Sequence, residues 1–414
     1  MQTRKRARSA DKKRSLRKLL EPVWDAVRGK DVDRLCAVLS DRGAELQGKL
    51  DTPNASTKHR DTALIMCAEG GFVAGVDILI REGAKVDLAR DDGCTPLFIA
   101  SQKGYPEVVS LLLKKGAAVD QPKNNGSTPL FKAAKNGHSK VVRLLLKKGA
   151  AVNLAKNTGA TPLFKAAQKG YPQVVSLLLK KGAALDHGDN DGCTPLFIAA
   201  AAGHRDVVNL MLKRGASANL ADNDGYTALY IAAQQGHPEI VSILVEHGET
   251  QIELTNNQGC NALHAAAFDD RPEVCLLLVA AGLDPEQPNN NDETALSHYG
   301  CSLDLNDPDD WDGEDDNTRP RLAAEQKRDR IAQIKSAREA FVLHRKREEN
   351  WQRRAPLMHA LVGSGLRLTA VQAAEHAAFQ AAMDYAAPIP PVPVDRLRDI
   401  LSNEGFVRAI TACV

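Results

Sequence analysis

The chain has 414 residues and a formal net charge of +2, with 54 Lys and Arg against 52 Asp and Glu. No apolar stretch reaches the length of a membrane span, and the N-terminus lacks the apolar segment of a signal peptide. The eight cysteines are scattered singly without a Cys-x-x-Cys pair, which argues against a disulfide framework or a zinc motif. We therefore expect a soluble intracellular protein.

The small net charge hides blocks of opposite sign. Residues 95–181 contain fifteen Lys and Arg against two acids, whereas residues 222–316 contain twenty-one acids and one base. Residues 319–354 are basic again, with twelve Lys and Arg against five acids. A charge distribution of this kind steers charged partners and can also hold one part of a chain against another.

The first 18 residues contain nine Lys and Arg, and we expect residues 1–19 to form a disordered basic arm. Its runs Arg4-Lys5-Arg6-Ala7-Arg8 and Lys12-Lys13-Arg14 have the form of a nuclear-import signal or an anchor to anionic surfaces. A solvated tail without a binding role is the alternative.

A repeat with a fixed period of 33 residues follows. It is marked by Thr62, Thr95, Thr128, Thr161, Thr194 and Thr227, and it continues at Asn261 and Thr294. In the repeat that begins at Thr128, this residue is a typical helix N-cap, and Gly137 and Gly149 end two short amphipathic helices. Each repeat is therefore predicted as turn, helix, turn, helix, and such units must stack to bury their apolar faces.

The consensus of the repeats is Thr-Pro-Leu-x-x-Ala-Ala, then Gly-His, then Val-Val-x-Leu-Leu-Leu-x-x-Gly-Ala. It resembles the ankyrin-repeat family over about residues 61–300. The resemblance implies an all-α ankyrin-repeat solenoid of stacked helix-turn-helix units with a C-terminal helical tail. We expect about eight repeats in residues 61–301, a degenerate first repeat that caps the array in residues 20–49, and a loop in residues 50–60.

The repeats depart from the family at one position. The His that usually follows Thr-Pro-Leu is replaced by Phe98, Phe131, Phe164, Phe197 and Tyr230, and it returns only as His264. We expect these aromatic rings to add core contacts in place of a hydroxyl–imidazole bond.

Beyond the repeats, we predict an acidic linker in residues 302–319, a helical tail in 320–387, a Pro-rich spacer in 388–393 and a C-terminal helix in 394–414. The acidic linker does not fit a calcium loop, because a register with Gly313 as the required glycine places Pro308 at the first ligand position.

The basic stretch 321–354 is expected to fold against the last repeats. Opposite charges, among them Asp284 and Glu286, would orient it, while Ile331, Ile334 and Phe341 would supply the apolar contact that stabilises it.

Motifs for catalysis are not found. The sequence has no His-Glu-x-x-His, no Walker loop and no Gly-x-Ser-x-Gly, and most of the eleven histidines recur at fixed places in the repeats. We expect a non-enzymatic protein without catalytic residues, metal or cofactor.

The family resemblance implies a concave recognition face made of the turn tips and the exposed side of each first helix. The candidate partner-binding residues are Asp91, Asp92, Lys103, Asn124, Asn125, Lys132, Lys135, Asn157, Lys165, Lys169, Asp191, Asp224, Tyr226 and Gln234. Lysines close together on one helix face destabilise the helix, so they hint at an anionic partner, with a merely solvated surface as the alternative. The pairs Lys114/Lys115, Lys147/Lys148 and Lys180/Lys181 instead end the second helices, where cations complement exposed carbonyls.

Two classes of function remain after these steps. The first is a protein–protein interaction scaffold, monomeric, in the cytoplasm and the nucleus, whose partner is a protein and can be acidic. The second is a protein that binds nucleic acid or an anionic surface through the basic arm and the lysines. Aromatic residues are only 4% of the chain, and the acidic half would repel a long polyanion, so the scaffold is favoured and nucleic acid is disfavoured.

Overall fold

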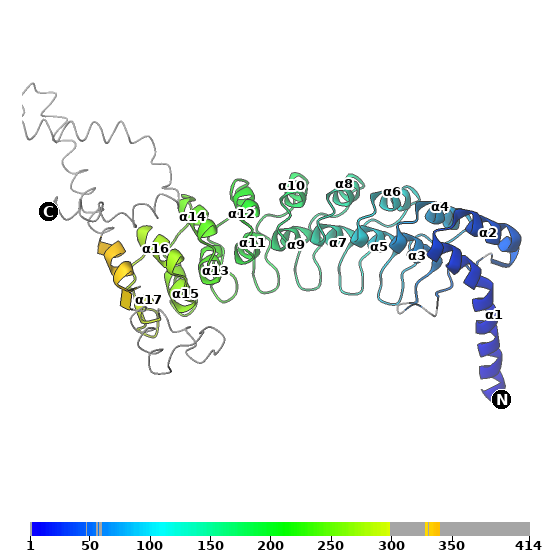
Figure 1. Cartoon of the computed structure of the whole chain (residues 1–414), viewed down its shortest axis with the longest axis horizontal. Helices are drawn as coiled ribbons and strands as arrows, with labels where there is room; N and C mark the ends of the chain where they lie inside the picture. The colour runs from blue at the N-terminus through cyan, green and yellow to red at the C-terminus, as the bar shows by residue number, and fades with distance from the viewer. Residues whose placement is uncertain are drawn as a thin grey trace, which may run out of the picture. The chain divides into compact units, whose positions relative to one another are not determined.

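The computed structural model describes residues 2–46, 48–54, 57, 60–298, 328–329 and 331–339. Their secondary structure is helices, turns and one isolated β-bridge between Pro288 and Thr294. The chain forms two compact units, Met1–Ala228 and Leu229–Val414. Figure 1 shows the helices of both, which are described separately below.

Helices of the first unit come in consecutive pairs, as the sequence predicts. They are α1 (Gln2–Gly29), α2 (Val32–Leu46), α3 (Ala63–Gly70), α4 (Val73–Arg81), α5 (Pro96–Lys103), α6 (Pro106–Lys114), α7 (Pro129–Lys135), α8 (Ser139–Lys147), α9 (Pro162–Gln168), α10 (Pro172–Lys180), α11 (Pro195–Ala201) and α12 (Arg205–Leu212).

Each first helix of a repeat begins at its threonine. The hydroxyl of Thr128 accepts a hydrogen bond of 3.1 Å from the backbone N–H of Phe131, and Thr95, Thr161 and Thr194 do the same three residues on. A proline at the first helical position loses nothing, because its missing N–H would have no intrahelical partner there. The threonines therefore fix the start of α5, α7, α9 and α11.

Histidines at the second helices connect neighbouring repeats. The Nε2 atoms of His138 and His204 lie 3.0 Å from the carbonyl oxygens of Gln102 and Gln168, each in the preceding repeat. These contacts confirm the predicted structural role of the two histidines.

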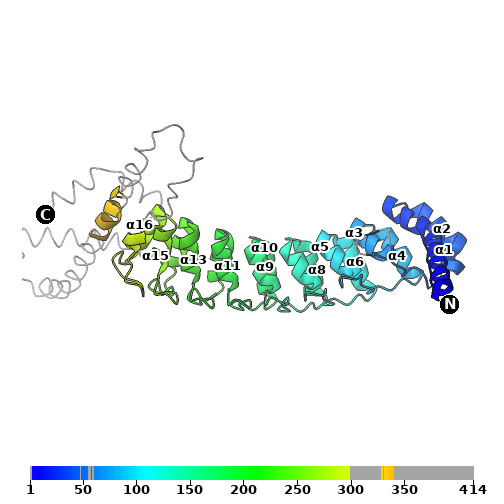
Figure 2. The ribbon, with the colours of Figure 1, turned by 90° about the horizontal axis from the view of Figure 1, so that it is seen from below.

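Stacked helices form two rows in the first unit (Figures 1 and 2). The first helices α3, α5, α7, α9 and α11 pack in one row and the second helices α4, α6, α8, α10 and α12 in the other, with the turn loops along one edge. Leucines of both rows are fully buried between them, and the rings of Phe98, Phe131, Phe164 and Phe197 are at most 6% exposed. The aromatic residues therefore belong to the core, as expected.

The second unit continues the same local pattern. Its helices are α13 (Ala228–Gln235), α14 (Pro238–Glu246), α15 (Ala262–Phe268), α16 (Pro272–Ala280) and the short α17 (Ala295–His298). Asn261 replaces threonine as the N-cap of α15 and forms a reciprocal capping box with His264. The backbone is also helical at 328–329 and 331–339.

The tail stretch 331–339 contacts the last repeat of the second unit. The Ile334 side chain is only 2% exposed, and the Arg338 guanidinium bonds to the carboxylates of Asp284, at 2.9 Å, and Glu286. The predicted docking of the basic stretch is confirmed for these residues. Phe341, the acidic linker, the Pro-rich spacer and the predicted C-terminal helix lie outside the described residues.

The arm is where the prediction was wrong. Residues 2–19, expected to be disordered, belong to α1 together with the first part of the expected cap. Ala, Lys, Arg and Leu are strong helix formers, and Arg17 and Glu21 form an i,i+4 pair that supports the helix. Strong propensity over the whole segment therefore outweighs the repulsion between its like charges.

Candidate protein-binding face

We call the side of the first unit formed by α5, α7, α9, α11 and the turn that precedes each of them the inner face. At its edge, the turns are tied to one another by asparagines. The side-chain amides of Asn124, Asn190 and Asn223 donate to the carbonyl oxygens of Asp91, Asn157 and Asn190 in the preceding turns, at 3.1–3.2 Å. The amide group of Asn124, predicted to bind a partner, is therefore already engaged within the fold. The side chains of Asn125 and Asn157 are exposed.

Six lysines from two neighbouring repeats meet on the inner face. Lys132 and Lys135 lie on α7, Lys165 on α9 and Lys169 directly after it, while Lys123 and Lys156 come from the turns before these helices. All are half-buried except Lys169, which is exposed. The sequence analysis found four of them and missed Lys123 and Lys156.

Aromatic rings lie under two of these lysines. The Lys132 ammonium is 6.0 Å from the centroid of the Phe98 ring, and the Lys165 ammonium is 5.2 Å from that of Phe164. Such contacts contribute about 0.5–1 kcal/mol at exposed sites. They hold the side chains of these two lysines against the face.

The lysines destabilise each other's charged form. Burial lowers the pKa of Lys132 below 10.5, and the charges of Lys135, Lys123 and Lys156 lower it further, while Cys94 opposes them. Burial likewise lowers the pKa of Lys165, as do Lys135, Lys156 and Lys169, while Asp189 opposes them. The inner face thus concentrates positive charge in partly desolvated positions.

Few acids neutralise this charge. Lys123 lies 3.0 Å from Asp92, and the Lys165 ammonium donates to the Gln168 side chain at 2.7 Å. Within the described part of the chain, no ion pair involves Lys132, Lys135, Lys156, Lys165 or Lys169. Lys103, on α5, is paired with Glu69 at 3.1 Å. The lysines of α7 and α9 are therefore available to an anionic group from outside.

Asp92 has a structural role of its own. Arg90 donates to Asp92 at 2.8 Å and to Asp61 at 3.2 Å, and the Asp92 carboxylate also accepts from the backbone N–H of Cys94. Burial alone would raise the pKa of Asp92, but the hydrogen bonds from Arg90 and Lys123 hold it well below its usual range. Asp91 is exposed and lies 3.9 Å from Arg60.

The next turns of the first unit are acidic. Asp189 accepts from the backbone N–H groups of Asp191 and Cys193, at 3.2 and 3.1 Å, and Asp222 accepts from those of Asp224 and Tyr226. Asp191 and Asp224 are exposed and Tyr226 is half-buried. The structure therefore places most candidate residues on the inner face of the first unit. Gln234 belongs to the second unit, on α13.

The repeat pattern agrees with a known family. The family model described as "Ankyrin repeats (3 copies)" matches residues 25–123, 64–156, 118–189, 150–222 and 196–289, which together span most of the chain. The chain belongs to the ankyrin-repeat family. Ankyrin repeats are in general protein–protein interaction modules. No curated protein matches this chain in a sequence search.

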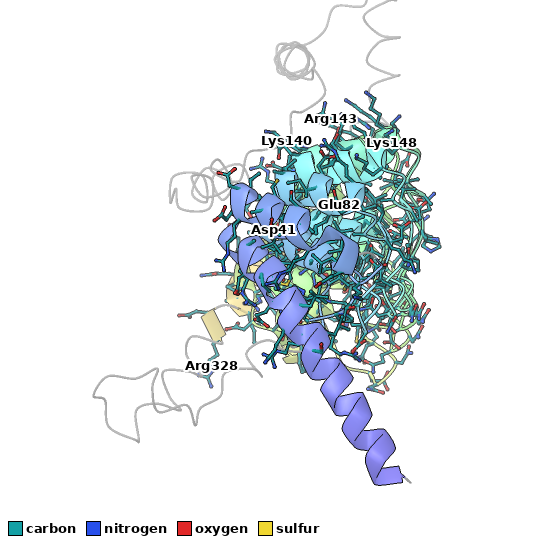
Figure 3. The ribbon with its side chains drawn as sticks, turned by 90° about the vertical axis from the view of Figure 1, so that its right-hand side faces the viewer. Asp41, Glu82, Lys140, Arg143, Lys148 and Arg328 are labelled. Carbon is teal, nitrogen blue, oxygen red and sulfur yellow. The ribbon has the colours of Figure 1, made fainter. Side chains whose placement is uncertain are left out.

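Cations also line the second helices of the ankyrin repeats, on the side away from the inner face. Figure 3 shows Lys140 and Arg143 of α8 and the neighbouring Lys148, and all three are exposed. Lys115 pairs with Asp77 at 3.0 Å. Lys140, Arg143 and Lys148 are suitable matched controls for the inner-face lysines, because they have the same charge and a different location.

Membrane spans and metal clusters are both absent from the residues that the structure describes. None of their helices combines the length and apolar character needed to cross a bilayer. In the same residues, no cluster of three or more His, Cys, Asp or Glu side chains is placed to hold a metal ion.

Proposed function

We propose that this ankyrin-repeat chain is a non-enzymatic scaffold that binds a protein partner on the inner face of its first unit. The observation that supports it best is the group of lysines on α7 and α9 without ion pairs. Partly buried charges without a counter-charge destabilise a fold, and a bound anionic group would relieve that cost.

The location of the lysines supports the same proposal. A turn and a helix from each of two neighbouring repeats contribute to one surface, so a partner would contact both repeats at once. Ankyrin repeats in general mediate protein–protein contacts, and the exposed Asn125, Asn157 and Thr158 offer polar groups beside the lysines.

A photo-crosslinking experiment in cells tests the proposal. A photoreactive amino acid would replace either Lys169 on the inner face or Lys140 on α8, both of which are exposed lysines. We expect the Lys169 position to crosslink to a distinct protein band that the Lys140 position does not give. The band should weaken when Lys132 and Lys165 are changed to Gln. Equal crosslinking from both positions, or crosslinks to nucleic acid alone, would contradict the proposal.

A further inference from the structure

Comparison of the repeats with one another reveals two positions where neighbouring repeats differ in the same way. Five residues before the repeat threonine or its equivalent, the chain has Thr57, Arg90, Lys123, Lys156, Asp189, Asp222, Asn256 and Asn289. Four residues after it, the chain has Met66, Ile99, Lys132, Lys165, Ile198, Ile231, Ala265 and His298. Lysine occupies both positions only in the two successive repeats that begin at Thr128 and Thr161.

Lysine is unfavourable for the fold at the turn position. Where this position is Asp or Asn, its side chain accepts two backbone N–H groups of the turn, as Asp189 does from Asp191 and Cys193. A lysine ammonium has donors only and cannot accept these bonds. In the repeat of Lys123, the Asn125 side chain accepts from the Ser127 N–H instead, and Lys123 pairs with Asp92. Each such bond contributes about 1 kcal/mol in a typical protein.

Lysine is also unfavourable at the helix position. Ile99, its equivalent on α5, is 3% exposed and packs with Ile65, Cys94 and Phe98. Lys132 and Lys165 instead place ammonium groups in half-buried positions, each close to other lysines of these two repeats. Two local rules are thus broken together in the same two repeats, which is the pattern expected where function, and not stability, determines the residue.

We propose that Lys123 with Lys132, and Lys156 with Lys165, form two successive anion sites that together bind an extended acidic segment of a partner protein. We call these two pairs the lysine box. The inference rests on the proposed function and specifies its partner: a segment with Asp or Glu side chains three residues apart.

The spacing of the repeats selects this pattern. Helices packed side by side are about 8–10 Å apart, so equivalent sites in adjacent repeats are separated by about that distance. A polyproline II segment advances about 3.1 Å per residue with three residues per turn, which places side chains i and i+3 on one side about 9 Å apart. In a β-strand, i and i+2 share a side but are only about 7 Å apart.

The charge of the segment favours the extended form. Neighbouring carboxylates repel one another and keep an acidic chain stretched. A long nucleic acid is less suitable, because a strand that followed the turns past Lys156 would meet the exposed carboxylates of Asp191 and Asp224 in the same unit. A helical segment with acids seven residues apart would span about 10 Å, and the test below separates it from the extended segment.

The test uses fluorescent peptides of equal length and charge with the full chain at one fixed ionic strength. Each peptide has two glutamates, at positions i and i+2, i and i+3, or i and i+7, in a Pro/Ser or an Ala-rich background. We expect the three-residue spacing in the Pro/Ser background to bind most tightly, about tenfold better than the two-residue spacing, which corresponds to about 1.4 kcal/mol.

Two variants locate the binding. Changing Lys123, Lys132, Lys156 and Lys165 to Gln should abolish the preference for the three-residue spacing. Changing Lys140, Arg143, Lys147 and Lys148 to Gln removes as many cations from the region of α8 and should preserve the preference. The circular dichroism of each variant shows whether it is folded, and the spacing series in the wild type does not depend on any variant.

Three results would overturn the inference. The affinity could be independent of the glutamate spacing, or the Ala-rich peptide with glutamates at i and i+7 could bind most tightly. The third is tighter binding of a single-stranded oligonucleotide than of any peptide. If these peptides do not bind but the Lys169 crosslink is found, the acidic-segment inference fails and the proposed scaffold function stands. If the inner face gives neither peptide binding nor the Lys169 crosslink, the acidic-segment inference and the proposed scaffold function both fail.

Discussion

The two lysine repeats of the first unit, which begin at Thr128 and Thr161, differ from the last repeat of the second unit in whether their excess charge is neutralised within the chain. In the second unit, Arg338 from the chain's own tail bonds to Asp284 and Glu286, and Ile334 of the same stretch is buried. In the first unit, Lys132 and Lys165 have half-buried positions and no ion pair among the described residues. Charge that the chain neutralises itself supports its fold, whereas we propose that charge left without a partner marks a surface for another molecule.

The largest expected effect concerns the tail. Changing Ile334 to Ser should release residues 331–339, because burial of an isoleucine side chain contributes about 1.5–3 kcal/mol. Amide hydrogen exchange across this stretch should become faster by about 10–100-fold, since 1.4 kcal/mol corresponds to a factor of ten.

Two controls separate apolar contact from charge in the tail. Changing the exposed Lys335 to Ser should leave the exchange nearly unchanged. Changing Arg338 to Gln should accelerate it only slightly, because exposed ion pairs contribute about 0–1 kcal/mol. If the Ile334 variant and the wild type exchange at the same rate, the tail does not depend on this contact.

Next in size is the stability of the lysine repeats. Changing Lys132 and Lys165 to Ile should stabilise the chain by about 1 kcal/mol per site, because the equivalent Ile99 and Ile198 show that the helix position accepts isoleucine. The midpoint of thermal unfolding should rise by about 2–4 °C for each kcal/mol. The acidic peptide should lose its affinity at the same time.

The matched change of Lys140 and Arg143 to Ile on α8 should alter the midpoint much less, since surface substitutions away from special features stay within about 0.5 kcal/mol. A lower midpoint for the inner-face variant would show that the lysines stabilise the fold. The contrast between the two units would then disappear.

A smaller loss is expected at the aspartate turn. Changing Asp189 to Ala removes the acceptor of two hydrogen bonds, from the N–H groups of Asp191 and Cys193, and should cost about 1–2 kcal/mol. Changing Asp189 to Asn keeps an acceptor oxygen and should cost clearly less. Chemical denaturation of both variants gives the comparison, and equal losses would mean that charge, and not hydrogen bonding, determines the residue at this turn.

The smallest effect is the dependence on pH. The pKa values of Lys132 and Lys165 are lowered in the folded chain, so the unfolded chain binds more protons between the lowered values and 10.5. Stability of the wild type should therefore rise, relative to the double Ile variant, as the pH increases through that range. The groups involved are those that face the two lysines, namely Lys123, Lys135, Lys156, Lys169, Asp189 and Cys94.

Thermal unfolding at increasing pH measures this difference. A wild type that loses stability against the variant as the lysines become neutral would show that their positive charge is favourable in the free protein, which contradicts the proposed role.

Much of this fold can be predicted from the sequence because its rules are local. Thr128 and Pro129 start a helix through capping alone, and the 33-residue period fixes which residues stack. The helical state of residues 2–19 was missed because a dense basic run was interpreted by its charge and not by its helix propensity.

The candidate site could be predicted only in part. Lys132 and Lys165 follow from the helix pattern, but the engagement of Asn124 and Asp92 within the fold depends on contacts with other turns, which a linear pattern does not contain. Lys123 and Lys156 had a signal that was available in the sequence: they occupy a turn position that is Asp or Asn in four other repeats.

A double-mutant cycle on the lysine box tests the central claim most directly. Lys132 and Lys165 would each be changed to Gln in the full chain, and each glutamate of the three-residue peptide would be changed to Gln in turn. We predict that each lysine couples to one glutamate, by about 1 kcal/mol or more, and hardly to the other. Equal coupling of each lysine to each glutamate would mean that the peptide responds only to the overall positive charge of the face. That result would contradict a spaced pair of sites.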